Sequence, residues 1–89
     1  MSEANNSHVL AVLRAEIAEI KGEAVDAPDA AFQEMHMIED LGLDSLDMMT
    51  ILFQVEQHFD LTIPEPDIDD KKLAMVGNMA EYVKQAKAA

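Results

Sequence analysis

Residues 44–60 read DSLDMMTILFQVEQHFD, the most regular apolar pattern in the chain. The run contains no Gly or Pro, and at about 100° per residue its apolar side chains fall on two sides of a helix. The expected core face comprises Met48, Ile51, Leu52, Val55 and Phe59. A second stripe comprises Leu46, Met49 and Phe53. The pattern predicts a helix from Ser45 to Asp60 whose second stripe is either covered by a loop or left for a partner.

The start of this helix carries a polar signature. Asp44 is placed to cap it, and Asp47 stands three residues later, as the second member of a capping box does. In that register the Ser45 side chain points outward, and a phosphoester on it would lie at the positive end of the helix dipole. The spacing alone leaves open that Asp44 and Ser45 only cap the helix.

The remaining segments predict a small all-α protein. A first helix is expected over Ser7 to Lys21, capped by Asn6 or Ser7 and ended by Gly22. Residues 23–42 have no clean period and predict a long loop held by scattered apolar side chains. Because loops of this length are uncommon in compact domains, this one needs either a short helical turn or a functional reason. After two prolines, residues 67–72 can form at most a short helix, and a last helix is expected over residues 75–87. We therefore expect a four-helix bundle of three main helices and one short helix.

Two positions near the start of the last helix run against local preference. Gly77 lies inside the expected helix, where glycine is a poor helix former, and Ala74 at its start is a poor cap. Both are expected to weaken this end of the helix.

The length of 89 residues predicts a single domain over residues 1–89, with residues 1–6 a flexible N-terminus. The absence of cysteine excludes disulfides, thiolate metal sites and a cysteine nucleophile. Neither an export signal nor a membrane-spanning run is visible, so a cytoplasmic protein that does not bind membranes is expected. The protein is also expected to be a monomer.

The charge distribution is strongly one-sided. Eighteen acidic residues face six basic ones, and no Lys or Arg occurs between Gly22 and Asp70. Such a surface repels nucleic acid and anionic lipid and attracts basic protein surfaces. The simpler alternative is an acidic surface that only keeps the protein in solution.

Three segments resemble the acyl carrier protein family. Residues 39–47, EDLGLDSLD, are similar to the phosphopantetheine attachment signature, in which an Asp-Ser-Leu triplet contains the modified serine. The resemblance continues through residues 59–64, FDLTIP, and residues 76–83, VGNMAEYV. It extends over nearly the whole chain and agrees with the length, the acidity and the helix order.

The resemblance implies a carrier and not an enzyme. Ser45 would receive 4′-phosphopantetheine from coenzyme A, and the thiol of that arm would hold an acyl group as a thioester. The implied partners are a phosphopantetheinyl transferase and acyl-loading and acyl-processing enzymes with basic docking patches. The residues that would meet them are Asp44, Leu46, Asp47, Met49, Phe53 and Glu56.

Some features depart from common fatty-acid carriers. Thr50 stands where many of these have a further acid, Gln57 and His58 dilute the acidic run, and residues 65–72 are longer and include Pro66. The cargo could therefore belong to fatty-acid or to specialised acyl or polyketide-like biosynthesis. An aminoacyl or peptidyl carrier and an unmodified structural subunit remain alternatives.

No other constellation predicts chemistry of its own. His8, His36 and His58 are far apart in the sequence and are expected at the surface, and no metal site is predicted. No catalytic residue is predicted, because no nucleophile has a base in a recognisable pattern near it.

Overall fold

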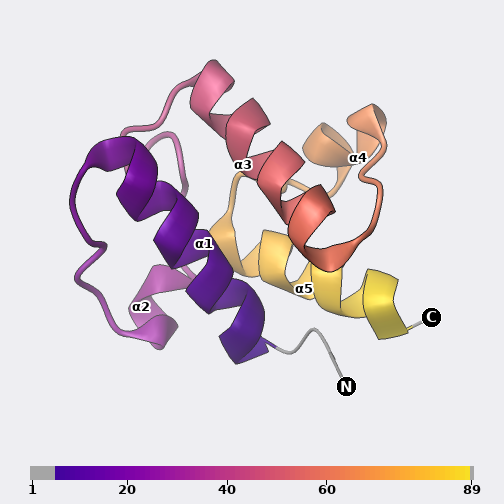
Figure 1. Cartoon of the computed structure of the whole chain (residues 1–89), viewed down its shortest axis with the longest axis horizontal. Coiled ribbons are helices and arrows are strands. Elements are labelled where there is room, and N and C mark those ends of the chain that lie inside the picture. The colour runs from indigo at the N-terminus through magenta and orange to yellow at the C-terminus, as the bar shows by residue number, and fades with distance from the viewer. Residues whose placement is uncertain (1–5, 89) are drawn as a thin grey trace.

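The structure is a computed structural model that describes residues 6–88. This range contains five helices and no strand: α1 (Asn6–Lys21), α2 (Asp29–Phe32), α3 (Ser45–Phe59), α4 (Glu65–Asp70) and α5 (Val76–Ala88). The helices α1 and α3 lie side by side, α5 crosses behind them, and the short helices α2 and α4 lie at opposite sides of the molecule (Figure 1). The prediction of a small all-α bundle is confirmed.

The helix ends differ from the predictions by one or two residues. The first helix already includes Asn6, so neither Asn6 nor Ser7 stands in front of it as a cap. The rest of the expected flexible N-terminus, residues 1–5, lies outside the described residues. Because Pro66 occupies the first turn of α4, where no N–H is needed, this helix begins at Glu65 rather than Asp67. A four-residue helix, α2, also interrupts the predicted long loop.

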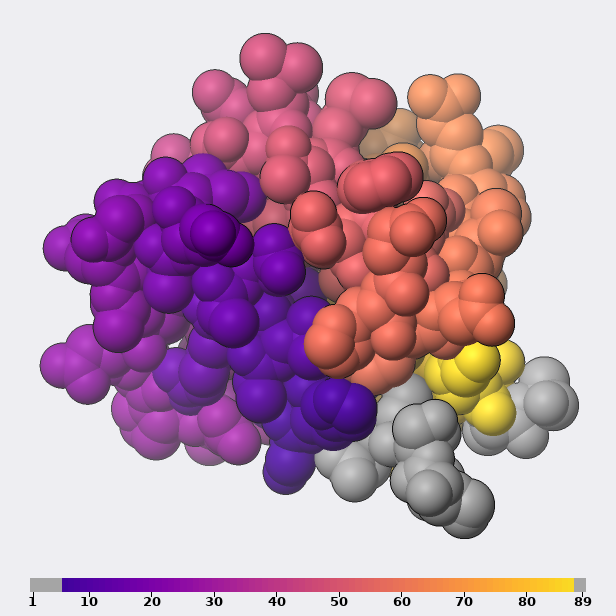
Figure 2. All heavy atoms as spheres, in the orientation of Figure 1, coloured from indigo at the N-terminus to yellow at the C-terminus, as the bar shows by residue number. Residues whose placement is uncertain are grey.

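The core is largely aliphatic and is built mainly from α1, α3 and α5. All five residues of the predicted α3 core face are buried, and no polar or charged side chain is buried among the described residues. Burying an apolar side chain of this size stabilises the fold by about 1.5–3 kcal/mol. In the space-filling view the side chains of α1 and α3 meet along one face of the molecule (Figure 2). The core packing therefore fixes which face of α3 turns outward.

Two basic side chains of α1 hold the long segment between α1 and α3. The Arg14 guanidinium donates to the carbonyl of Val25 at 2.9 Å and pairs with Asp29 at 2.9 Å. Its central carbon lies 4.5 Å from the centre of the Phe32 ring, a cation–π contact. Further along, the Lys21 ammonium donates to the carbonyl of Leu41 at 2.8 Å. The segment is thus fixed by polar contacts as well as by its apolar side chains.

The start of α5 is held by the same segment. The N–H of Val76 donates to the carbonyl of Met35 at 3.0 Å, and the N–H of Gly77 donates to that of Gln33 at 2.9 Å. These bonds satisfy N–H groups that a helix start leaves without partners. A Cβ added to Gly77 would lie 2.9 Å from the Gln33 carbonyl oxygen. The close approach of the Gln33 carbonyl to the backbone of α5 therefore requires a glycine at position 77. Helix propensity alone marks Gly77 as a weak point.

Candidate functional site

The site predicted from the sequence lies at the start of α3. The Asp44 side chain accepts a hydrogen bond from the Asp47 N–H at 2.9 Å, and the Asp47 carboxylate accepts one from the Asp44 N–H at 3.1 Å. This reciprocal pair is the predicted capping box. Because Asp44 is the cap, Ser45 is free of that role. Ser45 is exposed, and its hydroxyl has no hydrogen-bond partner among residues 6–88.

The loop before Ser45 is anchored on both sides. Leu41 and Leu43 are buried, and Gly42 between them has φ of +76°, a conformation that glycine adopts without strain. The N–H of Leu43 donates to the carbonyl of Met37 at 3.1 Å. Ser45 therefore lies between an anchored loop and a capped helix, and these fix the position of its backbone relative to the surface of α3.

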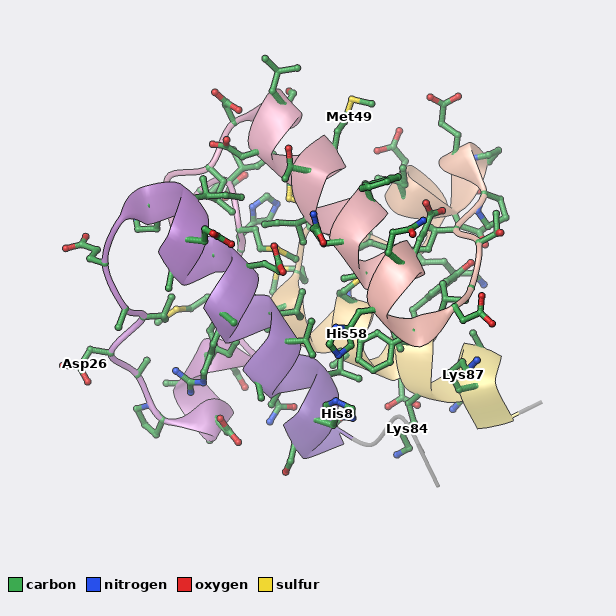
Figure 3. The ribbon with its side chains drawn as sticks, viewed as in Figure 1. His8, Asp26, Met49, His58, Lys84 and Lys87 are labelled. Carbon is green, nitrogen blue, oxygen red and sulfur yellow. The ribbon has the colours of Figure 1, made fainter. Side chains whose placement is uncertain are left out.

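The second apolar stripe of α3 is open to solvent. Leu46, Met49 and Phe53 are 74%, 65% and 56% exposed. In Figure 3 the Met49 side chain extends from α3 away from the rest of the molecule. Within the described residues no loop covers this stripe, so the covered alternative is wrong. We call Leu46, Met49 and Phe53 the outer stripe.

The three acids predicted beside the outer stripe also act within the protein. Asp44 and Asp47 form the capping box, and Glu56 accepts the N–H of Ile63 at 2.7 Å. These bonds hold the carboxylates in place and leave each with further acceptor positions. None of the three forms an ion pair with a Lys or Arg of residues 6–88. Their charge is therefore available to a basic partner.

A cavity of about 590 Å³ opens beside Ser45. Its wall comes from the loop before α3, from α3 itself, and from α4 and the segment that follows it. The lining residues are His36, Ile38, Ser45, Met48, Met49, Leu52, Ile68, Asp69, Lys72, Ala74 and Met75. The surface is thus largely apolar, with a few polar groups. A flexible chain attached to the Ser45 hydroxyl has an apolar space directly beside it.

The structure brings two of the three histidines together, which their sequence spacing does not predict. His8 of α1 and His58 of α3 have ring centres 5.7 Å apart, and both pack edge-on against Phe59 (Figure 3). The start of α1 lies beside the end of α3, so residues 50 positions apart meet. Among residues 6–88, no three His, Asp or Glu side chains converge as a metal site requires.

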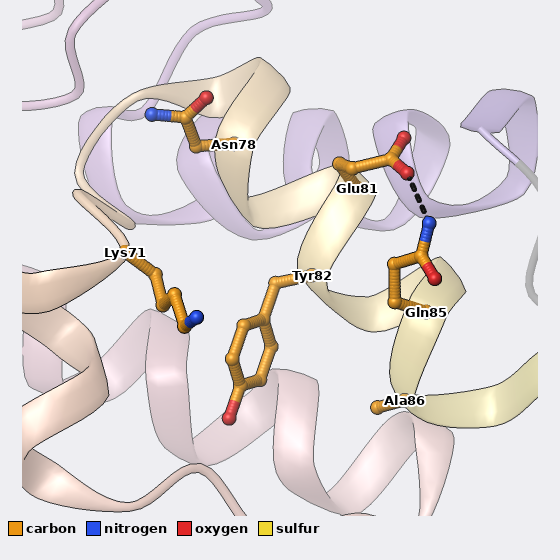
Figure 4. Close-up of a pocket in the computed structure, with 6 residues that line it drawn as sticks. All are labelled: Lys71, Asn78, Glu81, Tyr82, Gln85 and Ala86. Atoms are coloured by element: carbon orange, nitrogen blue, oxygen red, sulfur yellow. Dashed lines mark hydrogen bonds between the residues drawn. The ribbon is translucent and has the colours of Figure 1, made fainter. Parts of the chain in front are cut away.

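A second cavity, of about 470 Å³, lies between α5 and the end of α4, away from Ser45. Lys71, Asn78, Glu81, Tyr82, Gln85 and Ala86 line it (Figure 4). The Tyr82 hydroxyl donates to the Asp67 carboxylate at 2.7 Å and ties α5 to α4. Burial, together with the hydrogen bond and the charge of Asp67, raises the pKa of Tyr82 to about 12.

Within residues 6–88, none of the helices is both long enough and apolar enough to span a membrane.

Comparison with known proteins identifies similar chains. A family described as a phosphopantetheine attachment site matches residues 9–83. The acyl carrier protein of Kineococcus radiotolerans is 38% identical over 71 residues, which are 79% of this chain and 85% of that protein. The acyl carrier protein of Renibacterium salmoninarum is 36% identical over 86 residues, which are 96% of this chain and 99% of that protein.

Proposed function

Because the chain belongs to the acyl carrier protein family, whose defining feature is a phosphopantetheine attachment site, we propose that it carries acyl groups as thioesters on Ser45-linked 4′-phosphopantetheine. It acts as a carrier and not as an enzyme, and residues 1–89 form one carrier domain. When bound, the prosthetic group supplies the thiol that this cysteine-free chain lacks.

The observation that supports Ser45 as the attachment site is that its hydroxyl takes part in no interaction within the described residues. Its hydroxyl is exposed, has no hydrogen-bond partner among the described residues, and stands at the first position of α3. The capping box uses Asp44 and Asp47 instead, so modification of Ser45 would leave the cap intact. A phosphodiester on Ser45 lies at the positive end of the α3 dipole, which favours its negative charge.

The outer stripe and its acids form the partner surface. We propose that Leu46, Met49 and Phe53 contact partner enzymes directly while Asp44, Asp47 and Glu56 meet basic residues around them. The net charge of −12 attracts a basic partner from a distance, and the small apolar stripe adds contact area once the surfaces meet. The partners on this proposal are a phosphopantetheinyl transferase and acyl-loading and acyl-processing enzymes.

The cargo is an acyl group of fatty-acid or specialised acyl or polyketide-like biosynthesis. The largely apolar cavity beside Ser45 supports an acyl cargo over an aminoacyl or peptidyl one, because an acyl chain removes its apolar surface from water against such walls. The unmodified structural subunit is the remaining alternative. A monomeric, cytoplasmic carrier is a further part of the proposal, tested by gel filtration and cell fractionation.

One experiment tests the proposal. The apo protein is incubated with coenzyme A and a broad-specificity phosphopantetheinyl transferase, and its intact mass is measured. We expect a mass increase of one phosphopantetheinyl group in the wild type and none in Ser45→Ala, whose circular dichroism spectrum should match the wild type. An unmodified wild type, under conditions that convert another carrier, would favour the unmodified structural subunit.

A further inference from the structure

The cavity beside Ser45 contains two nitrogen groups that the fold does not use. His36 lines it from the loop before α3, and Lys72 from the segment that follows α4. Neither the Nε2 atom of His36 nor the Nζ atom of Lys72 has a hydrogen-bond or ion-pair partner among residues 6–88. Lys72 is exposed and His36 is half-buried, so both nitrogen groups are open to a ligand with acceptor atoms that enters the cavity.

Hydrogen bonds from two backbone N–H groups hold the neutral His36 ring in one tautomer. Its Nδ1 atom accepts the N–H of Ile38 at 3.2 Å and the N–H of Glu39 at 3.1 Å. An atom that accepts two hydrogen bonds has no proton of its own, so in the neutral ring the proton is on Nε2. The ring of His36 therefore presents an N–H donor at Nε2. The backbone N–H of His36 donates to the Asp40 carboxylate at 2.7 Å, and this bond holds the surrounding segment in place.

Lys72 occupies a backbone position that favours glycine. The N–H of Leu73 donates to the Ile68 carbonyl and that of Lys72 to the Asp69 carbonyl, which together form the C-terminal motif of α4. Lys72 stands at the left-handed position of this motif, with φ of +52°. A residue with a Cβ is strained there by roughly 1–2 kcal/mol. A lysine at this position indicates a role for its side chain.

The charge of Lys72 is unusual for its surroundings. After Lys21, the next Lys or Arg residues in the sequence are Lys71 and Lys72. The stretch between Lys21 and Lys71 contains fourteen carboxylates. Asp69 lines the same cavity, yet Lys72 pairs with neither Asp69 nor any other described carboxylate. Without Lys72, the acidic surroundings would repel any anion that entered the cavity.

Building on the proposed function, we infer that Lys72 and His36 bind an anionic oxygen group of the loaded arm in this cavity. Lys72 supplies the opposing charge and His36 supplies a fixed N–H donor, while the apolar wall holds the rest of the chain. Two parts of a loaded carrier offer this chemistry. One is the phosphodiester next to Ser45, and the other is a carboxylate at the far end of the cargo.

The test uses a pair of matched variants. Lys72→Asn removes the charge and keeps a residue that tolerates the left-handed backbone, so the fold is retained. The control, Lys71→Gln, removes the same charge from the neighbouring residue. Lys71 lines the second cavity, where it lies beside Tyr82 (Figure 4). Each protein is prepared unmodified, with the bare arm, and with butyryl and succinyl cargo, and the mass of each form is measured.

The readout is the NMR signal of the His36 Nε2–H group and of the Lys72 side chain. If the phosphodiester is the ligand, all three loaded forms shift both signals relative to the unmodified protein. If a cargo carboxylate is the ligand, the succinyl form alone shifts them. In either case the His36 shift is lost in Lys72→Asn and kept in Lys71→Gln.

Other outcomes would overturn the inference. These are unchanged signals in every loaded form, an effect of Lys71→Gln equal to that of Lys72→Asn, or a shift by butyryl cargo without one by the bare arm. They leave the proposed function intact, because the mass increase is still seen. A wild type that gains no mass overturns the proposed function, and this inference with it.

Discussion

Two phenylalanines on α3 differ in burial and should differ in their contribution to stability. Phe59 is 7% exposed and packs against the rings of His8 and His58, whereas Phe53 is 56% exposed in the outer stripe. Phe53 lies in the interior of α3 and Phe59 is its last residue, but helix propensity differs by less than about 1 kcal/mol between Phe and Ala at either position. The difference between Phe59→Ala and Phe53→Ala therefore reports mainly burial.

The expected magnitudes are far apart. Loss of a buried Phe side chain costs ~3–5 kcal/mol, while a surface substitution changes stability by about 0.5 kcal/mol or less. For 89 residues, ~0.05–0.15 kcal/mol per residue gives a total stability of about 4–13 kcal/mol. Phe59→Ala should consequently remove a large part of the total and could unfold the protein. If Phe59→Ala does not fold, Phe59→Leu, which removes fewer buried atoms, takes its place in the comparison.

Urea denaturation followed by circular dichroism measures both variants. We expect the midpoint to fall sharply for Phe59→Ala and to stay near the wild type for Phe53→Ala, with an unchanged slope. Equal losses of stability in Phe53→Ala and Phe59→Ala would refute the reasoning, because the outer stripe would then be part of the core.

Three further predictions concern other parts of the fold. Met49→Glu should leave the melting temperature nearly unchanged and slow modification of Ser45 by the transferase; a variant that unfolds would place Met49 in the core. Gly77→Ala should destabilise the protein by about 1–2 kcal/mol in urea titrations, since overpacking outweighs the gain in helix propensity; a stabilised variant would contradict the close approach to Gln33. The raised pKa of Tyr82, about 12 against an ordinary 10.0, means that the neutral hydroxyl stabilises the fold fully below pH 10 and less as the pH rises toward 12. The wild type should therefore lose more stability than Tyr82→Phe over that range, and equal losses would contradict the Asp67 contact.

The helix α3 could be predicted in detail because its pattern is uninterrupted. With no Gly or Pro between Ser45 and Asp60, one helical register extends over the whole run and places the core face on one side. The capping box could also be predicted, since Asp44 and Asp47 have the required spacing. The outward position of Ser45 followed from the same register, whereas the exposure of Leu46, Met49 and Phe53 could not be predicted from it, because a loop could have covered them.

The segment between α1 and α3 could not be predicted in the same way. Its shape depends on Arg14 and Lys21, which reach carbonyl groups and Asp29 far along the chain, and periodicity carries no information about such contacts. The reason for glycine at Gly77 is also tertiary, because it depends on Gln33. The contact between His8 and His58 likewise required knowing how α1 and α3 lie against each other.

The central claim is that the arm is attached to Ser45, and peptide mapping tests it most directly. The chain has three serines, Ser2, Ser7 and Ser45, and trypsin cleavage after Lys21 and Lys71 isolates Ser45 as the single serine of peptide 22–71. The loaded wild-type protein is digested, and this peptide is fragmented in the mass spectrometer. The account predicts that the phosphopantetheinyl group is on peptide 22–71 and that the fragments place it on Ser45. A group on another peptide, or on Thr50 or Thr62 of this one, would contradict it.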